Sequence, residues 1–194
     1  VHLYGLSAVI DELLEICEEF DVPLIEDAAE SLGSLYKGKQ TGTYGRFGIY
    51  SFNGNKIITT SGGGMLISNE EKKIAKARFW ATQSRENTRH YQHQEVGFNY
   101  RMSNIAAGIG RGQLKVLAQR IAKKRQIYQF YQKELVGLSM IEFMPQNQWD
   151  KPNYWLSVIL LKGILPVKLI CALEEAKIEA RPVWKPLHLQ PLFK

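Results

Sequence analysis

Apolar and polar positions along the chain follow two periods, of about 3.6 and about two residues. The longer period predicts amphipathic helices, and the shorter one, together with short apolar runs, predicts strands. The expected elements in chain order are a helix over 7–20, strands over 22–26, 47–52 and 64–68, a helix over 70–80, a long helix over 102–135, a strand over 154–161 and a helix over 167–176. The polar stretch 82–95 and the proline-containing stretch 181–194 are expected to be loops.

Two local signals refine the helices. Ser7 can cap the first helix, whose inner face carries apolar side chains such as Ile10 and Leu13. Glycines at 108, 110 and 112 can interrupt the long helix, because glycine weakens a helix interior.

Helices and strands alternate at short intervals, which is typical of an α/β fold. The composition changes after Gly137, so we expect two domains, over 1–135 and 136–194. At 194 residues and 45% hydrophobic residues, the chain can bury one good-sized core and a smaller appendage.

Lys56 is the strongest candidate for chemistry. It stands between the apolar strand 47–52 and a turn of small residues over 59–64. A lysine that acts as a nucleophile must be held in place and must lose its proton. Asp27 follows the strand 22–26, and ligands of open α/β sheets gather at the carboxyl ends of strands. We therefore expect Asp27 and Lys56 to face one pocket.

Each candidate also has a simpler interpretation. Lys56 alone could be an exposed loop lysine, and Asp27 could cap a helix that begins at Ala28. Ser51, at the end of its strand, could make a local turn. The residues by themselves leave these alternatives open.

The net charge of +6 excludes few classes of function. Basic residues concentrate over 111–125, but apolar residues interleave with them at helical spacing, which favours a solvated helix face over a nucleic-acid patch. Excess positive charge suits phosphorylated cofactors and nucleotide-diphosphate substrates. No apolar run is long enough for a membrane span, and no signal peptide opens the chain, so we expect a cytoplasmic protein.

Other kinds of site find little support. Cys17 and Cys171 are expected to be buried free thiols, and the histidines show no spacing typical of a metal site. His188 lies beside prolines and is expected to be structural, and no serine–histidine–aspartate arrangement favours hydrolysis.

Several motifs in sequence together resemble the DegT/DnrJ/EryC1/StrS family. The motifs are Glu26-Asp27-Ala28-Ala29, Ser51-Phe52 followed by Lys56, the glycine run 62–64 and Gly97-Phe98-Asn99-Tyr100-Arg101-Met102. The resemblance extends from His2 to His188. It implies a fold-type I enzyme that depends on pyridoxal 5'-phosphate, with part of its large domain and part of an α+β small C-terminal domain present. Family members are nearly twice as long, so we expect a fragment that lacks both ends.

The resemblance also implies residue roles. Lys56 would form the Schiff base, and Asp27 would pair with the pyridinium nitrogen of the cofactor. Ser51 would bind its phosphate, and Asn99 would reach the phosphate held by the partner chain of a homodimer. Glu30 stands where relatives carry glutamine or histidine near the phenolic oxygen of the cofactor. A carboxylate there would repel a phenolate, so Glu30 is expected either to turn away or to carry a proton.

The implied function is transfer of an amino group, from glutamate, to a nucleotide-linked keto sugar. A related branch that dehydrates sugars replaces the lysine with histidine, and the presence of Lys56 therefore favours transamination. Two alternatives stay open: a cofactor-binding regulator or inactive member of the same family, and a basic domain without enzymatic activity.

Overall fold

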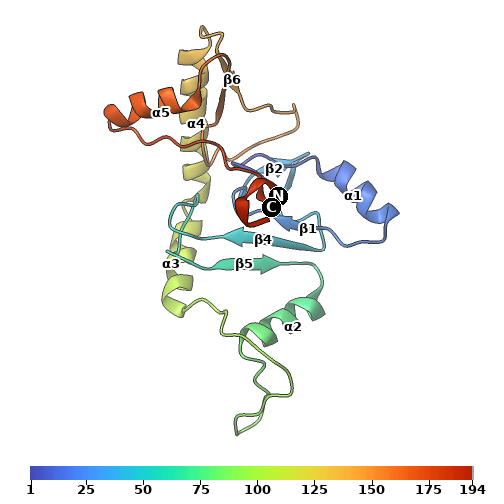
Figure 1. Ribbon diagram of the computed structural model, residues 1–194. Coiled ribbons are helices and arrows are strands. Elements are labelled where there is room, and N and C mark those ends of the chain that lie inside the picture. Colours follow the sequence, from blue (N-terminus) through green and yellow to red (C-terminus); the bar gives the residue numbers. More distant parts are fainter. Residues whose placement is uncertain (194) are drawn as a thin grey trace. The chain divides into compact units, whose positions relative to one another are not determined.

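The computed structural model describes residues 1–193 (Figure 1). The elements in chain order are α1 Ile10–Glu19, β1 Ile25–Asp27, β2 Leu35–Tyr36, β3 Lys39–Gln40, β4 Phe47–Ser51, β5 Gly64–Ile67, α2 Glu71–Ala81, α3 Asn104–Leu114, α4 Leu117–Leu135, β6 Ile141–Phe143, β7 Ile159–Leu161 and α5 Pro166–Glu175. Two short 3₁₀ turns follow, over Leu187–Leu189 and Pro191–Phe193. The fold is mixed α/β, which confirms the predicted class.

The chain divides into two compact units. The first comprises Val1–Tyr128 together with Gln146–Ser157, and the second comprises Gln129–Pro145 and the residues from Val158 onward. The predicted division into 1–135 and 136–194 did not foresee that 146–157 belongs with the first unit. The second unit contains the antiparallel pair β6–β7 and the helix α5, which begins with a proline in its first turn.

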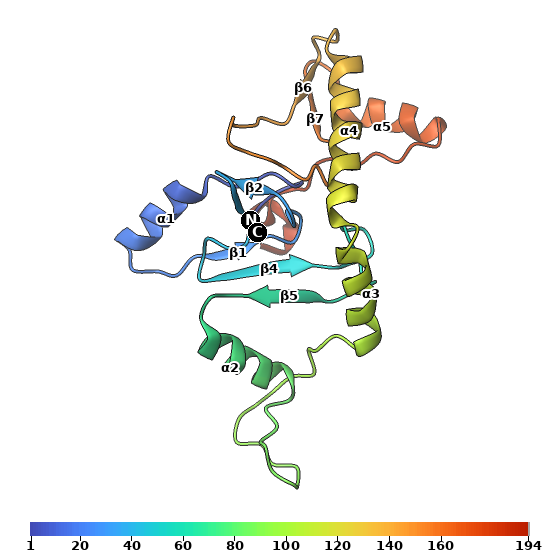
Figure 2. The ribbon, with the colours of Figure 1, turned by 180° about the vertical axis from the view of Figure 1, so that it is seen from behind.

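The first unit is built on a three-stranded sheet in the order β1-β4-β5. β1 runs parallel to β4, whereas β5 runs antiparallel to β4, and Figure 2 shows β4 and β5 side by side. One sheet face carries Asp27, Ile49 and Leu66, which pair across the strands, and Ile49 and Leu66 are exposed. The opposite face carries the buried side chains of Glu26 and Tyr50.

Several element boundaries differ from prediction. The long helix is interrupted as expected, but the break lies at residues 115–116 and the three glycines all remain inside α3. Ser103 caps α3 by accepting a hydrogen bond from the Ala106 N–H at 3.2 Å. Gly110 lies against the side chain of Thr60, where a β-carbon would come within 2.9 Å, so close packing accounts for this glycine.

Other differences concern caps and short strands. α1 begins at Ile10 without a side-chain cap, and Ser7 donates instead to the Ala8 carbonyl at 2.7 Å. Leu13 is exposed rather than inward-facing. The hairpin β2–β3 and strand β6 were not predicted, since strands of two or three residues carry too little periodicity to detect.

Buried Glu26 ties the beginning of the chain to the sheet. Its carboxylate accepts hydrogen bonds from the backbone N–H groups of Gly42, Tyr44 and Gly45 at 2.6 to 2.7 Å. His2 Nδ1 accepts the Ala8 N–H, so the ring hydrogen lies on Nε2, which donates to Glu26 at 2.9 Å. A β-carbon on Gly48 would lie 1.9 Å from the Gly42 carbonyl oxygen, so only glycine lets this loop cross β4.

The charge of Glu26 is stabilised by these donors. Burial raises the pKa of its carboxyl, but the hydrogen bonds from His2 and the three backbone groups outweigh burial and lower the pKa below the ordinary 4.5. A lowered pKa in the folded state contributes stability above pH 4.5, and this contribution is lost as the pH falls through the folded value.

Glu26→Gln is therefore expected to lower the free energy of unfolding by about 3 kcal/mol at neutral pH, because an amide cannot accept all four donors. The difference from the wild type should shrink as the pH falls below 4.5. Denaturant unfolding at several pH values measures both effects. Glu12→Gln, at an exposed position of α1, should change the stability by less than about 0.5 kcal/mol. A pH-independent difference, or equal effects of the two variants, would contradict this role of Glu26.

Candidate active site

The carboxyl ends of β1 and β4 meet at one edge of the sheet. Asp27 ends β1 and pairs in register with Ile49, and Ser51 ends β4 two positions later. Because side chains alternate along a strand, Asp27, Ile49 and Ser51 lie on the same, partly exposed face. Two of the predicted site residues therefore share one edge and one face of the sheet.

Lys56 lies in the loop directly after β4, residues 52–63, which we call the lysine loop. The loop is closed at its base by hydrogen bonds from the Thr60 N–H to the Phe52 carbonyl at 2.9 Å and from the Phe52 N–H to the Gly63 carbonyl at 3.1 Å. Ile57 and Ile58 bury their side chains and anchor the loop to the core. This anchoring fixes the backbone that carries Lys56.

The Lys56 ammonium is largely shielded from solvent. Its side chain is 13% exposed, and Nζ lies 4.0 Å from Glu30 Oε1. Nζ also lies over the Trp155 ring, 4.3 Å from the ring centroid, at a distance typical of a cation–π contact. The interpretation of Lys56 as an exposed loop lysine does not fit this position.

Glu30 faces Lys56 and does not turn away from it. Its Oε2 accepts the Tyr4 N–H at 2.6 Å. Burial raises the pKa of Glu30 above the ordinary 4.5, and the negative charge of Asp27 raises it further, whereas the Tyr4 hydrogen bond and the charge of Lys56 oppose the shift only in part. The protonated form of Glu30 is thus favoured relative to an exposed glutamate.

Asp27 does not cap a helix, since residues 28–34 form turns. Its Oδ1 accepts the Ala29 N–H at 3.1 Å, while Oδ2 has no hydrogen-bond partner among residues 1–193. Ser51 receives only a long contact of 3.5 Å from the Asn53 N–H, and its own hydroxyl hydrogen is not donated within the described chain. Both side chains therefore keep hydrogen-bonding capacity for a ligand.

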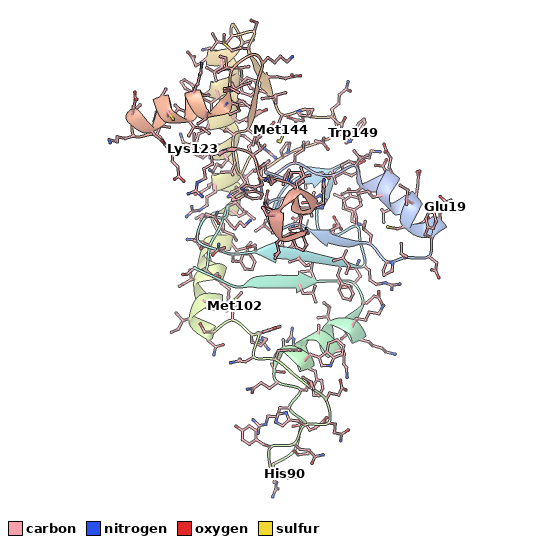
Figure 3. All side chains as sticks on the ribbon, in the orientation of Figure 1. Glu19, His90, Met102, Lys123, Met144 and Trp149 are labelled. Carbon is pink, nitrogen blue, oxygen red and sulfur yellow. The ribbon has the colours of Figure 1, made fainter. Side chains whose placement is uncertain are left out.

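Asn99 lies apart from these residues. It is exposed, and its backbone pairs with Thr82 in the long loop between α2 and α3. Figure 3 shows the outer end of this loop at His90, far from the sheet. Within residues 1–193 no hydrogen bond, ion pair or ring contact joins the Asn99 side chain to Asp27, Ser51 or Lys56.

The segment 153–155 is a part of the site that sequence reasoning missed. The predicted strand began at Tyr154, but β7 begins only at Ile159. Asn153 is fully buried and donates from Nδ2 to the Glu30 and Leu32 carbonyls, both at 3.0 Å. Its Oδ1 accepts the Trp155 N–H at 2.8 Å.

Trp155 links this segment to the lysine loop. Its indole Nε1–H donates to the Asn55 carbonyl at 2.7 Å, and its ring carries the contact with Lys56. Tyr154 adopts a φ of 49°, which no strand residue has, and this conformation turns its neighbours toward the core. The available signal was Pro152-Asn153, a pair typical of turns rather than strands.

The predictions about cysteine burial are wrong. Cys17 is half-buried and Cys171 is exposed, because their helices each keep a large solvent-facing surface. Across residues 1–193 no group of three or more acidic, histidine or cysteine side chains is arranged to hold a metal ion. In the same part of the chain, no helix has the length and hydropathy needed to cross a bilayer.

Comparison with known sequences identifies relatives along the whole chain. The profile of the DegT/DnrJ/EryC1/StrS aminotransferase family matches residues 1–194. The chain is 57% identical over 194 residues to EpsN of Bacillus subtilis (strain 168), of which it covers 50%. It is 38% identical over 197 aligned residues to GDP-perosamine synthase of Vibrio cholerae, of which it covers 53%. The chain thus spans about half the length of the curated relatives that it matches.

Solved structures show the same fold. The aminotransferase TlmJ from Streptoalloteichus hindustanus superposes with a TM-score of 0.93 at 25% identity, over 100% of this chain and 53% of that chain. Helicobacter pylori PseC, an aminotransferase involved in the biosynthesis of pseudoaminic acid, superposes with a TM-score of 0.92 at 21% identity, over 98% of this chain and 53% of that chain.

Trp155→Phe is expected to loosen the lysine loop while keeping an aromatic ring under Nζ. Loss of the hydrogen bond to the Asn55 carbonyl should speed hydrogen exchange at the Lys56 and Thr60 amides roughly fivefold to tenfold, because a neutral hydrogen bond contributes about 1 kcal/mol. Hydrogen–deuterium exchange resolved by NMR measures these rates.

The matched control is Trp149→Phe, at an indole that is 44% exposed. It should leave both amides unchanged. Unchanged exchange in Trp155→Phe, or an equal acceleration in Trp149→Phe, would show that the Trp155 indole does not hold the loop.

Proposed function

The chain belongs to the DegT/DnrJ/EryC1/StrS aminotransferase family, and on this premise we propose that its protein is a pyridoxal phosphate-dependent sugar aminotransferase. The proposed substrate is a nucleotide-linked keto sugar, and the proposed amino donor is glutamate. EpsN carries the words pyridoxal phosphate-dependent aminotransferase in its name, and the similarity to GDP-perosamine synthases supports a nucleotide-linked substrate.

One observation carries the proposal more than any other. A shielded lysine follows β4, and its Nζ lies 4.0 Å from a buried carboxylate, Glu30, at the same sheet edge as Asp27. A fixed primary amine beside two carboxylates in different environments suits a reaction in which protons move at one carbon centre.

The residues at this edge fit pyridoxal phosphate. Asp27 Oδ2 has no partner within residues 1–193 and can pair with a protonated ring nitrogen. The Ser51 hydroxyl can donate to a phosphate oxygen, which makes a strong charge-assisted bond. Glu30, with its raised pKa, can keep a proton and donate to the phenolic oxygen instead of repelling it.

When bound, pyridoxal phosphate supplies an aldehyde that bonds to amines and a ring that withdraws electrons from the carbon beside the bonded nitrogen. Lys56 Nζ would hold the cofactor, and as a free amine it would take and return a proton as general acid and base. The Asp27 carboxylate would pair with the ring nitrogen, which would strengthen the electron demand of the ring. Trp155 covers one side of Lys56 Nζ and limits the access of water to the amine.

We propose that two chains complete the site. Asn99 is exposed and makes no side-chain hydrogen bond within residues 1–193, so it is free to reach the phosphate held by a partner chain. A homodimer of this kind would make the isolated protomer inactive, and Asn99 would act only across the interface.

Lys56→Ala tests the function directly. The native protein is assayed with pyridoxal phosphate, glutamate and a nucleotide-linked 4-keto sugar, and the amino sugar is detected by mass spectrometry. Lys56→Ala should lower kcat by a factor of about 10²–10⁴ or more, the range for loss of a positioned acid–base group. Lys72→Ala, an exposed lysine on α2, should retain full activity. Wild-type protein that binds the cofactor without any turnover would instead favour a cofactor-binding regulator.

Asp27→Asn should weaken catalysis with little effect on the fold. Asparagine keeps the size of the side chain and can still accept the Ala29 N–H, but it cannot carry the negative charge. We expect kcat/KM to fall roughly hundredfold, since a hydrogen bond to a charged group contributes up to about 3 kcal/mol. Asp21→Asn, at an exposed position after α1, is the matched control. Near-normal turnover of Asp27→Asn would remove Asp27 from the mechanism.

A further inference from the structure

A hollow opens beside the lysine loop in the first unit. Its volume is about 290 Å³. One wall is the lysine loop with Trp155, and the other wall is one face of α4. The lining residues are Asn55, Lys56, Ile57, Arg120, Lys123, Lys124, Ile127 and Trp155.

On α4, both Lys123 and Lys124 lie three or four positions from Arg120 and from Ile127, which places these residues on one helix face. Three of them are basic: Arg120, Lys123 and Lys124. Figure 3 labels Lys123 on α4. With Lys56, four cationic side chains line the hollow, and no carboxylate does.

Within residues 1–193, the side chains of Arg120, Lys123 and Lys124 take part in no ion pair or hydrogen bond. The neighbouring Arg125 is different, because its guanidinium donates to the Pro152 and Lys151 carbonyls at 3.0 and 3.2 Å. Arg125 thus has a structural role, whereas the other three cations are left for a ligand. Like charges that converge on a concave surface repel one another, and a bound anion relieves this repulsion.

We propose that this hollow binds the diphosphate group of the nucleotide-linked substrate. The inference rests on the proposed function, which supplies the sugar nucleotide. From Arg120 to Lys124 the helix rises about 6 Å, so the three cations can contact two adjacent phosphoryl groups rather than one. The phosphate of the cofactor has separate proposed donors in Ser51 and Asn99. Arg120, Lys123 and Lys124 are then substrate-binding residues that hold the sugar nucleotide next to Lys56.

The test uses the cofactor-free chain, so that its result does not depend on Lys56 chemistry. Isothermal titration at constant ionic strength measures the Kd of GDP, pyrophosphate and inorganic phosphate. The double variant Lys123→Gln/Lys124→Gln is compared with the double variant Lys115→Gln/Lys133→Gln, which removes the same charge outside the hollow. Both pairs are surface lysines, and circular dichroism verifies that each variant is folded.

We expect GDP and pyrophosphate to bind at least tenfold more tightly than phosphate. The Lys123/Lys124 variant should bind GDP and pyrophosphate about tenfold or more weakly, because it lacks two charge-assisted contacts. The Lys115/Lys133 variant should bind as the wild type does. Equal weakening by both variants, no binding of pyrophosphate, or phosphate binding as tight as diphosphate binding would each overturn the proposal.

A second measurement needs no variant. Reductive methylation followed by mass spectrometry reports the exposure of each lysine, and GDP should protect Lys123 and Lys124 but not Lys133. Absence of this protection at saturating GDP would also overturn the assignment. Normal trapping of pyridoxal phosphate by Lys56 alongside failed diphosphate binding would reject this subsite and leave the proposed function standing.

Discussion

The parallel pairing of β1 with β4 is the constraint on which the site depends. It sets Asp27 opposite Ile49, so that both strands end at the same edge and the lysine loop leaves from that edge. A shift of one residue would turn Asp27 to the opposite face. Glu26 opposes such a shift, because on the buried face it holds the loop 42–45 that leads directly into β4. Glu26 thus maintains the position of Asp27 beside it.

Environment gives three neighbouring carboxylates different properties. Glu26 is surrounded by donors that stabilise its charge, and the pKa is lowered. Glu30 has a single backbone donor and a distant ammonium, so burial dominates and the pKa is raised. Asp27 differs from both in its hydrogen bonds, because one carboxylate oxygen accepts the Ala29 N–H and the other has no partner within residues 1–193. Within five residues of chain, one carboxylate is thus stabilised in its charged form and another in its protonated form.

The cations near Lys56 show a similar division. Arg125 donates hydrogen bonds to the Lys151 and Pro152 carbonyls, and these bonds hold the segment that carries Trp155. Arg120, Lys123 and Lys124 of the same helix line an open hollow. Sequence spacing alone indicated a solvated helix face, and the concave surroundings are what the structure adds.

Sequence reasoning predicted the parts of the fold that depend on local pattern. Strands β4 and β5 and helices α2 and α5 lie within one or two residues of their expected bounds. The sequence also predicted that Asp27 and Lys56 lie next to strand ends, and the structure has them at the end of β1 and in the loop after β4. That the two residues face one pocket stays a prediction. The roles of Asp27, Glu30, Ser51, Lys56 and Asn99 stay predictions.

What the sequence did not reveal depends on contacts between distant residues. Trp155 reaches Asn55 from about a hundred positions along the chain, and Asn153 holds carbonyls at 30 and 32. Neither contact leaves a local periodicity, and the apolar run 154–161 therefore resembled one strand. The break of the long helix at 115–116 likewise follows no glycine or proline.

The central claim is that Lys56 is the residue that bonds to pyridoxal phosphate. The most direct test is to incubate the purified protein with the cofactor, reduce it with borohydride and map the modified peptides by mass spectrometry. The account predicts that the pyridoxyl group is found on Lys56, close to one per chain, and that Lys56→Ala protein carries no comparable label. Label on another lysine, or label spread evenly over exposed lysines, would contradict it.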